Sequence, residues 1–247
     1  MSNRVRIIPV LSLMGNKLVK TVKFKNPNYL GDPLNAIKIF NDKRVDELIV
    51  LDIEASKLKK EPNYKLIYEM AGEAFMPLGY GGGIRTLDQA KKIFGLGIEK
   101  VVLNSVIFEN PSIVTQIANI YGAQSVVLSM DVKKNLIGKS RPHFNSGKEY
   151  LKEDLMAFAL RLIELGVGEI ILQDIERDGT FAGYNLSLIE MLKQLPVPIV
   201  AMGGCNGIED MKKAIASGAS AIAAGSVFVY RNNDPKSILI NYPKINL

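Results

Sequence analysis

Two glycine-containing turns near the end of the chain are the stretches most suited to chemistry. Gly203 and Gly204 follow one apolar run, and Gly225 and Ser226 follow the next, with a helical pattern at 208–216 between them. Because glycine has no Cβ, backbone N–H groups at such turns can approach an anion closely. Two turns at successive strand ends can therefore point several N–H groups at one phosphate. The sequence predicts a phosphate-binding site here.

The same arrangement occurs earlier in the chain at a constant distance. Gly82 lies 121 residues before Gly203, and the residues around both glycines follow the same order. A second pair of segments, ELIVLDIE at 47–54 and EIILQDIE at 169–176, repeats at a distance of 122 residues. A repeat of this length is half of a domain and not one unit of a solenoid. The sequence therefore predicts an α/β fold, a single (β/α)8 TIM barrel built from two similar half-barrels.

Length and composition agree with one barrel domain over residues 1–247. The chain is 47% hydrophobic, and no Pro-, Gly- or Ser-rich linker separates the two halves. Its net charge of +6 is scattered, which favours a phosphorylated substrate or an acidic partner over nucleic acid. We expect a cytosolic protein without membrane contact, because no apolar stretch has the length of a membrane span or of a leader. One cysteine and one histidine argue against a disulfide and a metal site, and nothing predicts a cofactor.

Strand and helix patterns alternate along the chain. In a barrel of this kind the chemistry lies where each strand ends and the next loop begins. Two long segments, 14–33 and 134–150, follow the first and fifth strands, and loops of this length are usually lids or binding loops. The eight strands are predicted at 5–11, 47–51, 75–79, 100–103, 125–130, 169–172, 198–202 and 219–224.

An ordered set of motifs carries a family resemblance. The set includes RIIPVL, VDELIVLDIEAS, GGGI, EKVVLNS, SMDVK, DIERDGTFAGY, MGGCNG and AAGSVF. Over about residues 4–230 it resembles the cyclase subunit of imidazole glycerol phosphate synthase, the HisF family. The resemblance implies a (β/α)8 barrel in which ammonia, made by a HisH-like partner glutaminase, reaches a substrate with a phosphate at each end. It also implies the products imidazole glycerol phosphate and an aminoimidazole carboxamide ribotide.

The resemblance implies catalytic roles for three positions. In the family, two aspartates at the ends of the first and fifth strands act as general acid and base on opposite sides of the closing ring. Asp131 matches the aspartate of the fifth strand, and Lys20 fits the pattern of the first long loop. Ser12 stands where the family has the other aspartate. Because a serine hydroxyl cannot replace a carboxylate in proton transfer near neutral pH, this departure predicts impaired ring closure.

Other family positions are matched at both ends of the predicted barrel. Asp178 and Thr180 match the substrate loop after the sixth strand. The implied phosphate sites are Gly83, Asn104 and Ser105 for one, and Gly179, Gly204, Gly225 and Ser226 for the other. The charged ring through which ammonia enters is matched by Arg6, Glu47, Lys100 and Glu169 at strand beginnings. Apart from the resemblance, four charges at that end would serve equally as ion pairs for stability.

Several polar residues have two interpretations. Asp52 and Asp174, after the second and sixth strands, could bind substrate hydroxyls or cap the segments that follow them. Cys205 lies near the predicted mouth, but a nucleophilic cysteine needs a base, and His143 is predicted in a distant loop. That loop is either solvated or a clamp on an anionic substrate, and its basic residues are Lys139, Arg141, His143 and Lys148.

Two functions are consistent with these residues. The first is a working cyclase of histidine biosynthesis. The second is a paralogue without efficient ring closure that channels ammonia to a separate amidotransferase for acetamidino sugars of surface polysaccharides, which Ser12 favours. A barrel isomerase that opens an aminoaldose needs no glutaminase, and the four-residue ring disfavours it. The sequence alone names neither the true substrate and pathway nor an assembly beyond a glutaminase complex.

Overall fold

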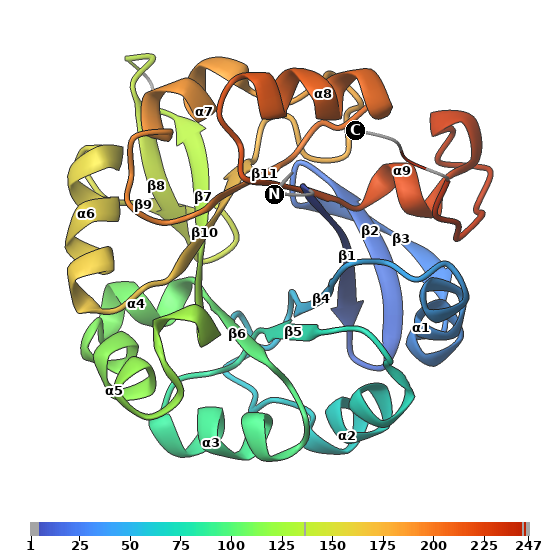
Figure 1. The fold of residues 1–247 in the computed structure, drawn as a ribbon, viewed down its shortest axis with the longest axis horizontal. Helices are drawn as coiled ribbons and strands as arrows, with labels where there is room; N and C mark the ends of the chain where they lie inside the picture. The colour runs from blue at the N-terminus through green and yellow to red at the C-terminus, as the bar shows by residue number, and fades with distance from the viewer. Residues whose placement is uncertain (1–4, 136, 244, 246–247) are drawn as a thin grey trace.

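The parallel strands close into a barrel. The computed structural model describes residues 5–135, 137–243 and 245, and within them eight parallel strands form a continuous circle in which β7 pairs with β10 (Figure 1). This confirms the predicted (β/α)8 TIM barrel. Around the circle the strands are β10 (Glu169–Asp174), β11 (Ile199–Met202), β12 (Ala221–Ala224), β1 (Arg6–Met14), β4 (Leu48–Asp52), β5 (Leu78–Gly81), β6 (Lys100–Leu103) and β7 (Val126–Lys134).

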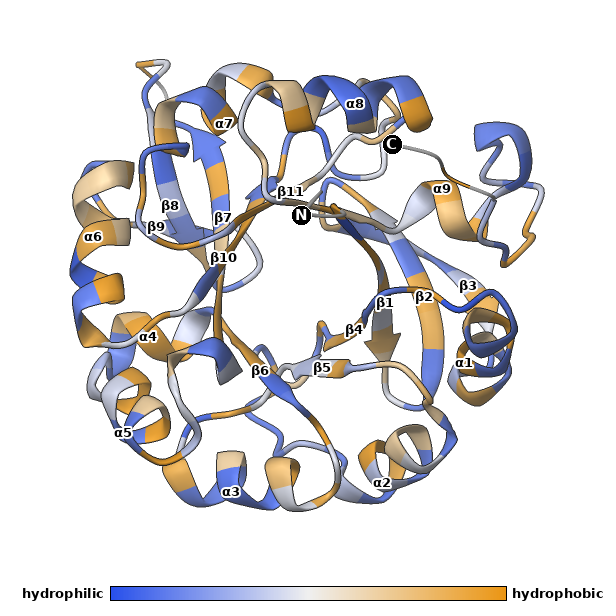
Figure 2. Ribbon diagram, in the orientation of Figure 1, coloured by the Kyte–Doolittle hydropathy of each residue, from blue (hydrophilic) through white to orange (hydrophobic). Residues whose placement is uncertain are grey.

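Helices form an outer ring around the strands (Figure 1). Their apolar faces turn toward the barrel, as Figure 2 shows by the alternation of orange and blue along them. None of the helices in the described ranges has the length and apolar character needed to cross a membrane. The α-helices are α1 (Pro33–Asp42), α2 (Tyr64–Glu73), α3 (Leu87–Gly95), α4 (Ser105–Glu109), α5 (Ser112–Tyr121), α6 (Leu155–Leu165), α7 (Leu186–Leu192), α8 (Ile208–Ala216) and α9 (Ser226–Val229), and the 3-10 helices are η1 (Ala123–Ser125) and η2 (Arg231–Asn233).

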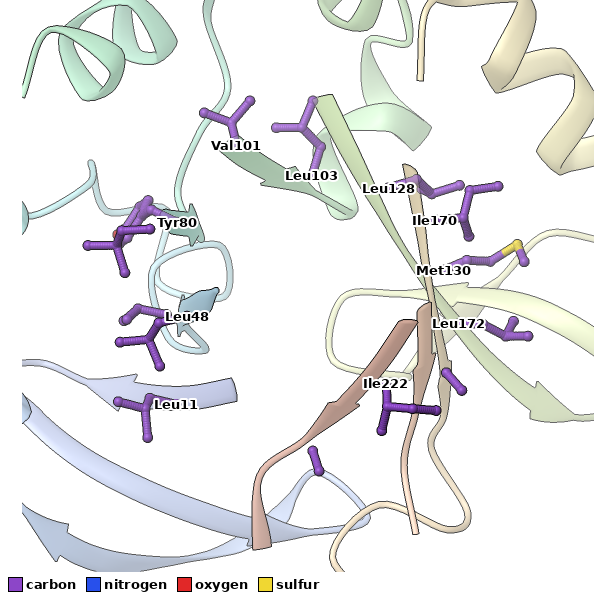
Figure 3. Packing of buried hydrophobic residues seen from close by; sticks show 14 of the residues in the cluster. Leu11, Leu48, Tyr80, Val101, Leu103, Leu128, Met130, Ile170, Leu172 and Ile222 are labelled. Atoms are coloured by element: carbon purple, nitrogen blue, oxygen red, sulfur yellow. The ribbon is translucent and has the colours of Figure 1, made fainter. Parts of the chain in front are cut away.

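The strands separate two apolar layers. One lies between strands and helices, and Figure 3 shows part of it around Tyr80, Leu128 and Ile170. The other fills the inside of the barrel and consists of Ile8, Val10, Ile49, Val102, Val127, Ile171, Val200, Ala221 and Ala223. Because side chains alternate between the faces of a strand, every second residue continues the inner face. Ser12 and Asp131 therefore face the inside of the barrel.

Two antiparallel hairpins extend the barrel at the carboxyl ends of its strands. The segment after β1 forms β2 (Lys17–Val22) and β3 (Lys25–Gly31), and the segment after β7 forms β8 (Ser140–Phe144) and β9 (Glu149–Tyr150). The two long insertions are therefore ordered hairpins and not irregular loops. Because β2 and β8 provide new hydrogen-bonding partners, β1 and β7 continue beyond their predicted ends at residues 11 and 130.

The third barrel strand is displaced from its predicted position. It was expected at 75–79 but spans Leu78–Gly81 as β5. Phe75 is 88% exposed and precedes the strand, so its β-favouring side chain was a misleading signal. The predicted and observed strands share residues 78 and 79, and the other seven predicted strands also overlap observed ones.

The sequence repeat at 121 residues corresponds to equivalent secondary-structure elements in the two half-barrels. β12 and α8 have the same lengths as β6 and α3 and lie 121 residues after them. Gly82 and Gly203 occupy equivalent turns with φ of 112° and 96°. A Cβ on Gly82 would lie 2.3 Å from the carbonyl oxygen of Asp52, and one on Gly203 would lie 2.7 Å from that of Asp174. Only glycine fits these two turns, because both the conformation and the lack of space exclude a side chain.

Candidate functional site

Asp131 is the carboxylic acid on the inner face of β7. It is buried and lies in register between Gln173 of β10 and His143 of β8. The hydroxyl of Ser129 donates a hydrogen bond to its Oδ1 at 3.3 Å. Burial raises the pKa of Asp131 to about 8; the Ser129 hydrogen bond works against this rise and the charge of Asp178 adds to it. The acid therefore holds its proton at neutral pH and can deliver it to a bound molecule.

Ser12 lies on the opposite side of the barrel from Asp131. It is on β1, four strands from β7 in either direction around the circle, in register with Leu51 of β4 and Val19 of β2. Ser12 and Asp131 thus occupy matching places, each where a barrel strand continues into a hairpin. Both positions are therefore held by strand pairing on two sides, but only Asp131 carries an ionisable side chain.

A pocket at the ends of β11 and β12 brings together all four residues of one predicted phosphate site. Its volume is about 270 Å³, which includes space open to solvent. A Cβ on Gly204 would lie 2.3 Å from the carbonyl oxygen of Gly183, so this wall is bare backbone. The hydroxyl of Ser226 is buried and has no hydrogen-bonding partner among the described residues, which leaves it for a ligand. Of the predicted residues, the lining includes Lys20, Asp178, Gly179, Gly204, Gly225 and Ser226.

An ion pair forms one wall of this pocket. Lys20 Nζ lies 2.9 Å from Asp178 Oδ1, and both side chains are buried. Lys20 also donates to the carbonyl oxygen of Thr21 at 2.9 Å. The pair joins the β2–β3 hairpin to the loop after β10. Lys20 therefore lines this pocket, where its positive charge favours an anion.

The equivalent turns of the first half-barrel are occupied by protein groups. Asn104 Nδ2 donates to the carbonyl oxygen of Ser129 at 2.8 Å. The hydroxyl of Ser105 donates to Asn104 Oδ1 and accepts from the backbone N–H of Asn145 in the β8–β9 turn. The N–H of Gly83 lies 3.5 Å from the hydroxyl of Ser56. Gly83 follows β5, and Asn104 and Ser105 follow the neighbouring strand β6. A phosphate bound at Ser105 would have to displace the contact with Asn145.

The four charged residues at the other end of the barrel form a closed ring. Arg6 bonds to both Glu47 and Glu169, and Lys100 Nζ lies 2.8 Å from a carboxylate oxygen of each. The two carboxylates are almost fully buried, whereas Arg6 keeps 34% of its side chain exposed. Burial alone would raise the pKa of Glu169, but hydrogen bonds and charges from Arg6 and Lys100 lower it, so this carboxylate is ionised. The ring closes the inner layer at that end.

Other polar residues have structural roles. Asp52 Oδ1 accepts hydrogen bonds from the N–H groups of Glu54 and Ala55, and Asp174 Oδ1 accepts from those of Glu176 and Arg177. Of the two interpretations of Asp52 and Asp174, the structure therefore supports capping. The Thr180 hydroxyl donates to the carbonyl oxygen of Arg177 at 2.7 Å and holds the loop after β10.

His143 differs from its predicted environment. It was expected in a basic loop that is solvated or clamps a substrate, but it is buried in β8 and stacks on Tyr150. Burial lowers its pKa, so the ring is neutral at pH 7. Cys205 lines the pocket at the ends of β11 and β12, and burial raises the pKa of its thiol, which makes it a poor nucleophile. Within the described ranges, no cluster of His, Cys, Asp or Glu side chains could hold a metal ion.

Sequence reasoning missed Gln173. This residue is the third inner-face position of β10, after Glu169 and Ile171, and its side chain is 2% exposed. The signal was present in the segment EIILQD, where a polar amide falls at an alternate position of an otherwise apolar strand. Both amide atoms of Gln173 lack a hydrogen-bonding partner among the described residues.

Comparisons with known proteins agree with the fold and the motifs. A sequence model of the family described as histidine biosynthesis protein matches residues 6–234. A Pseudomonas aeruginosa protein with the provisional name imidazole glycerol phosphate synthase subunit hisF2 is 48% identical over 245 residues, or 98% of this chain and 97% of that protein. A Leptospira borgpetersenii protein provisionally named subunit HisF is 46% identical, over 97% and 95% of the two chains. Imidazole glycerol phosphate synthase subunit HisF of Helicobacter hepaticus is 34% identical, over 96% and 95%.

The raised pKa of Asp131 predicts a pH-dependent gain in stability for Asp131→Asn. Between its ordinary pKa of 3.8 and about 8, the folded protein keeps a proton that the unfolded chain releases, so wild-type stability falls as pH rises. The advantage of the variant in free energy of unfolding should grow by about 1 kcal/mol per pH unit from pH 5 to pH 8. Urea denaturation across this range measures it. Asp42→Asn, at an exposed position, is the control, and parallel pH profiles for Asp131→Asn and wild type would show that Asp131 is already ionised.

The free hydroxyl of Ser226 predicts unequal anion binding by the two glycine-rich sites. Inorganic phosphate should raise the melting temperature of the wild type, and Ser226→Ala should weaken phosphate binding by about tenfold through loss of one hydrogen bond. Ser105→Ala, whose hydroxyl already has protein partners, is the matched control and should reduce binding less. Equal losses in both variants would contradict the difference between the sites.

Proposed function

The chain belongs to the histidine biosynthesis protein family, and from this membership we propose that it is a HisF-like cyclase subunit. In this role it takes ammonia from a glutaminase partner and reacts it with a bisphosphorylated ribonucleotide. The products are imidazole glycerol phosphate and an aminoimidazole carboxamide ribotide. The observation that carries the proposal is the inward-facing acid Asp131 at the barrel end where two glycine-rich turns lie on separate half-barrels.

The two glycine-rich turns support a substrate with a phosphate at each end. They belong to equivalent positions of the two half-barrels, with Asp131 and Ser12 on strands between them. The turn beside Gly204 and Ser226 offers bare backbone, a free hydroxyl and the Lys20 ammonium. A substrate held at both ends would lie across the mouth of the barrel, over the inner-face residues. This placement would bring its reacting centre to Asp131.

The chemistry that Asp131 can perform follows from its burial. As a neutral acid it can protonate an oxygen or nitrogen that gains negative charge, and once ionised it can take a proton back. Its pKa of about 8 is close to the working pH, which makes both transfers accessible. Ser12 itself has no such group, so proton transfer by this residue would depend on substrate or solvent.

The opposite end of the barrel supports delivery of ammonia. The inner layer between the charged ring and Asp131 consists of Val, Ile and Ala side chains. A neutral ammonia molecule can enter such an environment at much lower cost than ammonium, which would lose its hydration. The ring of Arg6, Glu47, Lys100 and Glu169 would then be the entrance that faces the glutaminase.

A second candidate function rests on Ser12. A paralogue of this family could keep the ammonia path and lose ring closure, passing ammonia to a separate amidotransferase that makes acetamidino sugars for surface polysaccharides. Such a protein needs the charged ring and the glutaminase contact but not two carboxylates at the mouth. The serine at position 12 favours this alternative, since the structure holds Ser12 as firmly as Asp131 without giving it a proton to transfer at neutral pH.

The effect of Ser12→Asp distinguishes the two functions. With ammonia and the bisphosphate substrate, the wild type should be slower than a typical cyclase by about 10²-fold or more, because one positioned acid or base is missing. Ser12→Asp should recover part of this rate in steady-state kinetics. Adding Asp131→Asn to Ser12→Asp should remove the recovered rate. A wild type with ordinary cyclase turnover, unchanged by Ser12→Asp, would eliminate the paralogue function.

Binding of a glutaminase tests the ammonia path. The protein should bind a cognate glutaminase and raise its rate of glutamine hydrolysis, which calorimetry and a glutamate assay measure. Lys100→Met should reduce turnover driven by glutamine but leave turnover driven by added ammonia within about threefold, because it disturbs the entrance and not the mouth. Lys38→Met, at an exposed lysine of α1, is the control. Failure to bind or stimulate any cognate glutaminase would refute the proposed entrance.

A further inference from the structure

Gln173 is a buried amide without a protein partner. Its side chain is 2% exposed, and neither Oε1 nor Nε2 has a hydrogen-bonding partner among the described residues. A buried amide left in this state destabilises the folded protein, because both groups lose hydrogen bonds to water. A leucine or methionine at this position would avoid that cost. A ligand that forms hydrogen bonds with the amide would explain why glutamine occupies this buried position.

The position of Gln173 is between the apolar interior and the acid at the mouth. On the inner face of β10, Glu169 belongs to the charged ring, Ile171 to the apolar layer, and Gln173 follows next. Across the sheet, Gln173 is in register with Asp131 of β7 and with Met202 of β11. A small molecule that rises through the barrel from the ring would thus meet the Gln173 amide as it leaves the apolar layer.

The chemistry of the site limits what can bind there. An anion is disfavoured, since the carboxamide carries no charge and the residue in register with it, Asp131, is an acid. A cation is disfavoured because the carboxylic acid in register with Gln173 is neutral at pH 7. The amide offers one acceptor and two N–H donors, which match a small neutral molecule that has both N–H groups and a lone pair. Ammonia has this combination.

We propose that Gln173 binds ammonia at the top of the barrel interior and orients it toward the substrate beside Asp131. The Oε1 atom accepts an N–H of ammonia, which leaves the ammonia lone pair free to attack. The Nε2 group donates to a polar atom of the substrate at the same level. This role rests on the proposed function, because it takes the barrel interior as the route of ammonia.

Nuclear magnetic resonance of the side-chain amides tests the binding directly. The two Nε2 protons of Gln173 are identified in the 15N-labelled protein by their loss in Gln173→Met. Titration with ammonium chloride should shift these signals, and the shift should grow with the fraction of free ammonia as pH is raised. Sodium chloride at the same pH and ionic strength corrects for titration of Asp131. The absence of an ammonia-dependent shift would overturn the proposal.

Two measurements on Gln173→Met provide a second readout. The variant removes both polar groups at similar volume, so its melting temperature should rise by about 2–8 °C. Its KM for ammonia should rise at least about tenfold with kcat within about threefold, since one binding contact is lost. Ile120→Val, at an exposed position of α5, is the control and should leave this KM unchanged. A Gln173→Met variant that is less stable than wild type would mean that the amide has a structural partner, which contradicts the proposal.

The glutaminase assay separates this inference from the proposed function. Gln173→Met should stimulate glutamine hydrolysis as the wild type does, because Gln173 is remote from the charged ring. An ammonia-dependent shift without glutaminase stimulation would support the Gln173 site and refute the proposed delivery of ammonia. Stimulation without the shift would leave the proposed function in place and overturn the role of Gln173.

Discussion

The pairing of β7 with β10 closes the parallel sheet, and the closed barrel has an inner face that is largely buried. Six consecutive residues of each strand are in register along this seam, from Glu169 with Val127 to Asp174 with Val132. Every polar group on the inner face must then be paired, neutral or held for a ligand. The four charges at one end are paired, Asp131 is neutral at pH 7, and Gln173 has no hydrogen-bonding partner in the part of the chain that the structure describes. The chemistry proposed for the protein follows from how burial on the inner face affects the charged ring, Asp131 and Gln173.

The two hairpins explain how the mouth residues are held. In many barrels the residues after each strand lie on loops, but here Ser12 and Asp131 each have a paired strand on both sides. A backbone held on both sides moves little, which favours the small positional tolerance that proton transfer requires. The Lys20–Asp178 ion pair extends this support, because it fixes the first hairpin to the loop after β10. The mouth is thus part of the sheet.

The two half-barrels share a backbone but differ in which side chains are free. Ser105 and Ser226 begin equivalent short helices, yet Ser105 is bonded to its neighbours and Ser226 has no partner among the described residues. Asp131 and Ser12 differ in the same way, one with an ionisable group and one without. Unequal halves suit a substrate whose ends and faces are chemically different, since each half then supplies a different contact.

The repeat at 121 residues, the eight strands and the glycine turns could be read from the sequence, because periodicity and the need for glycine are local properties. Placement of Phe75 in a strand was wrong, since its exposure depends on where α2 ends and β5 begins. The pKa of Asp131, the burial of His143, the capping by Asp52 and the unpartnered amide of Gln173 were decided by the tertiary structure alone. Each depends on contacts between residues far apart in the chain, and a single sequence records a residue's type but not the groups that surround it.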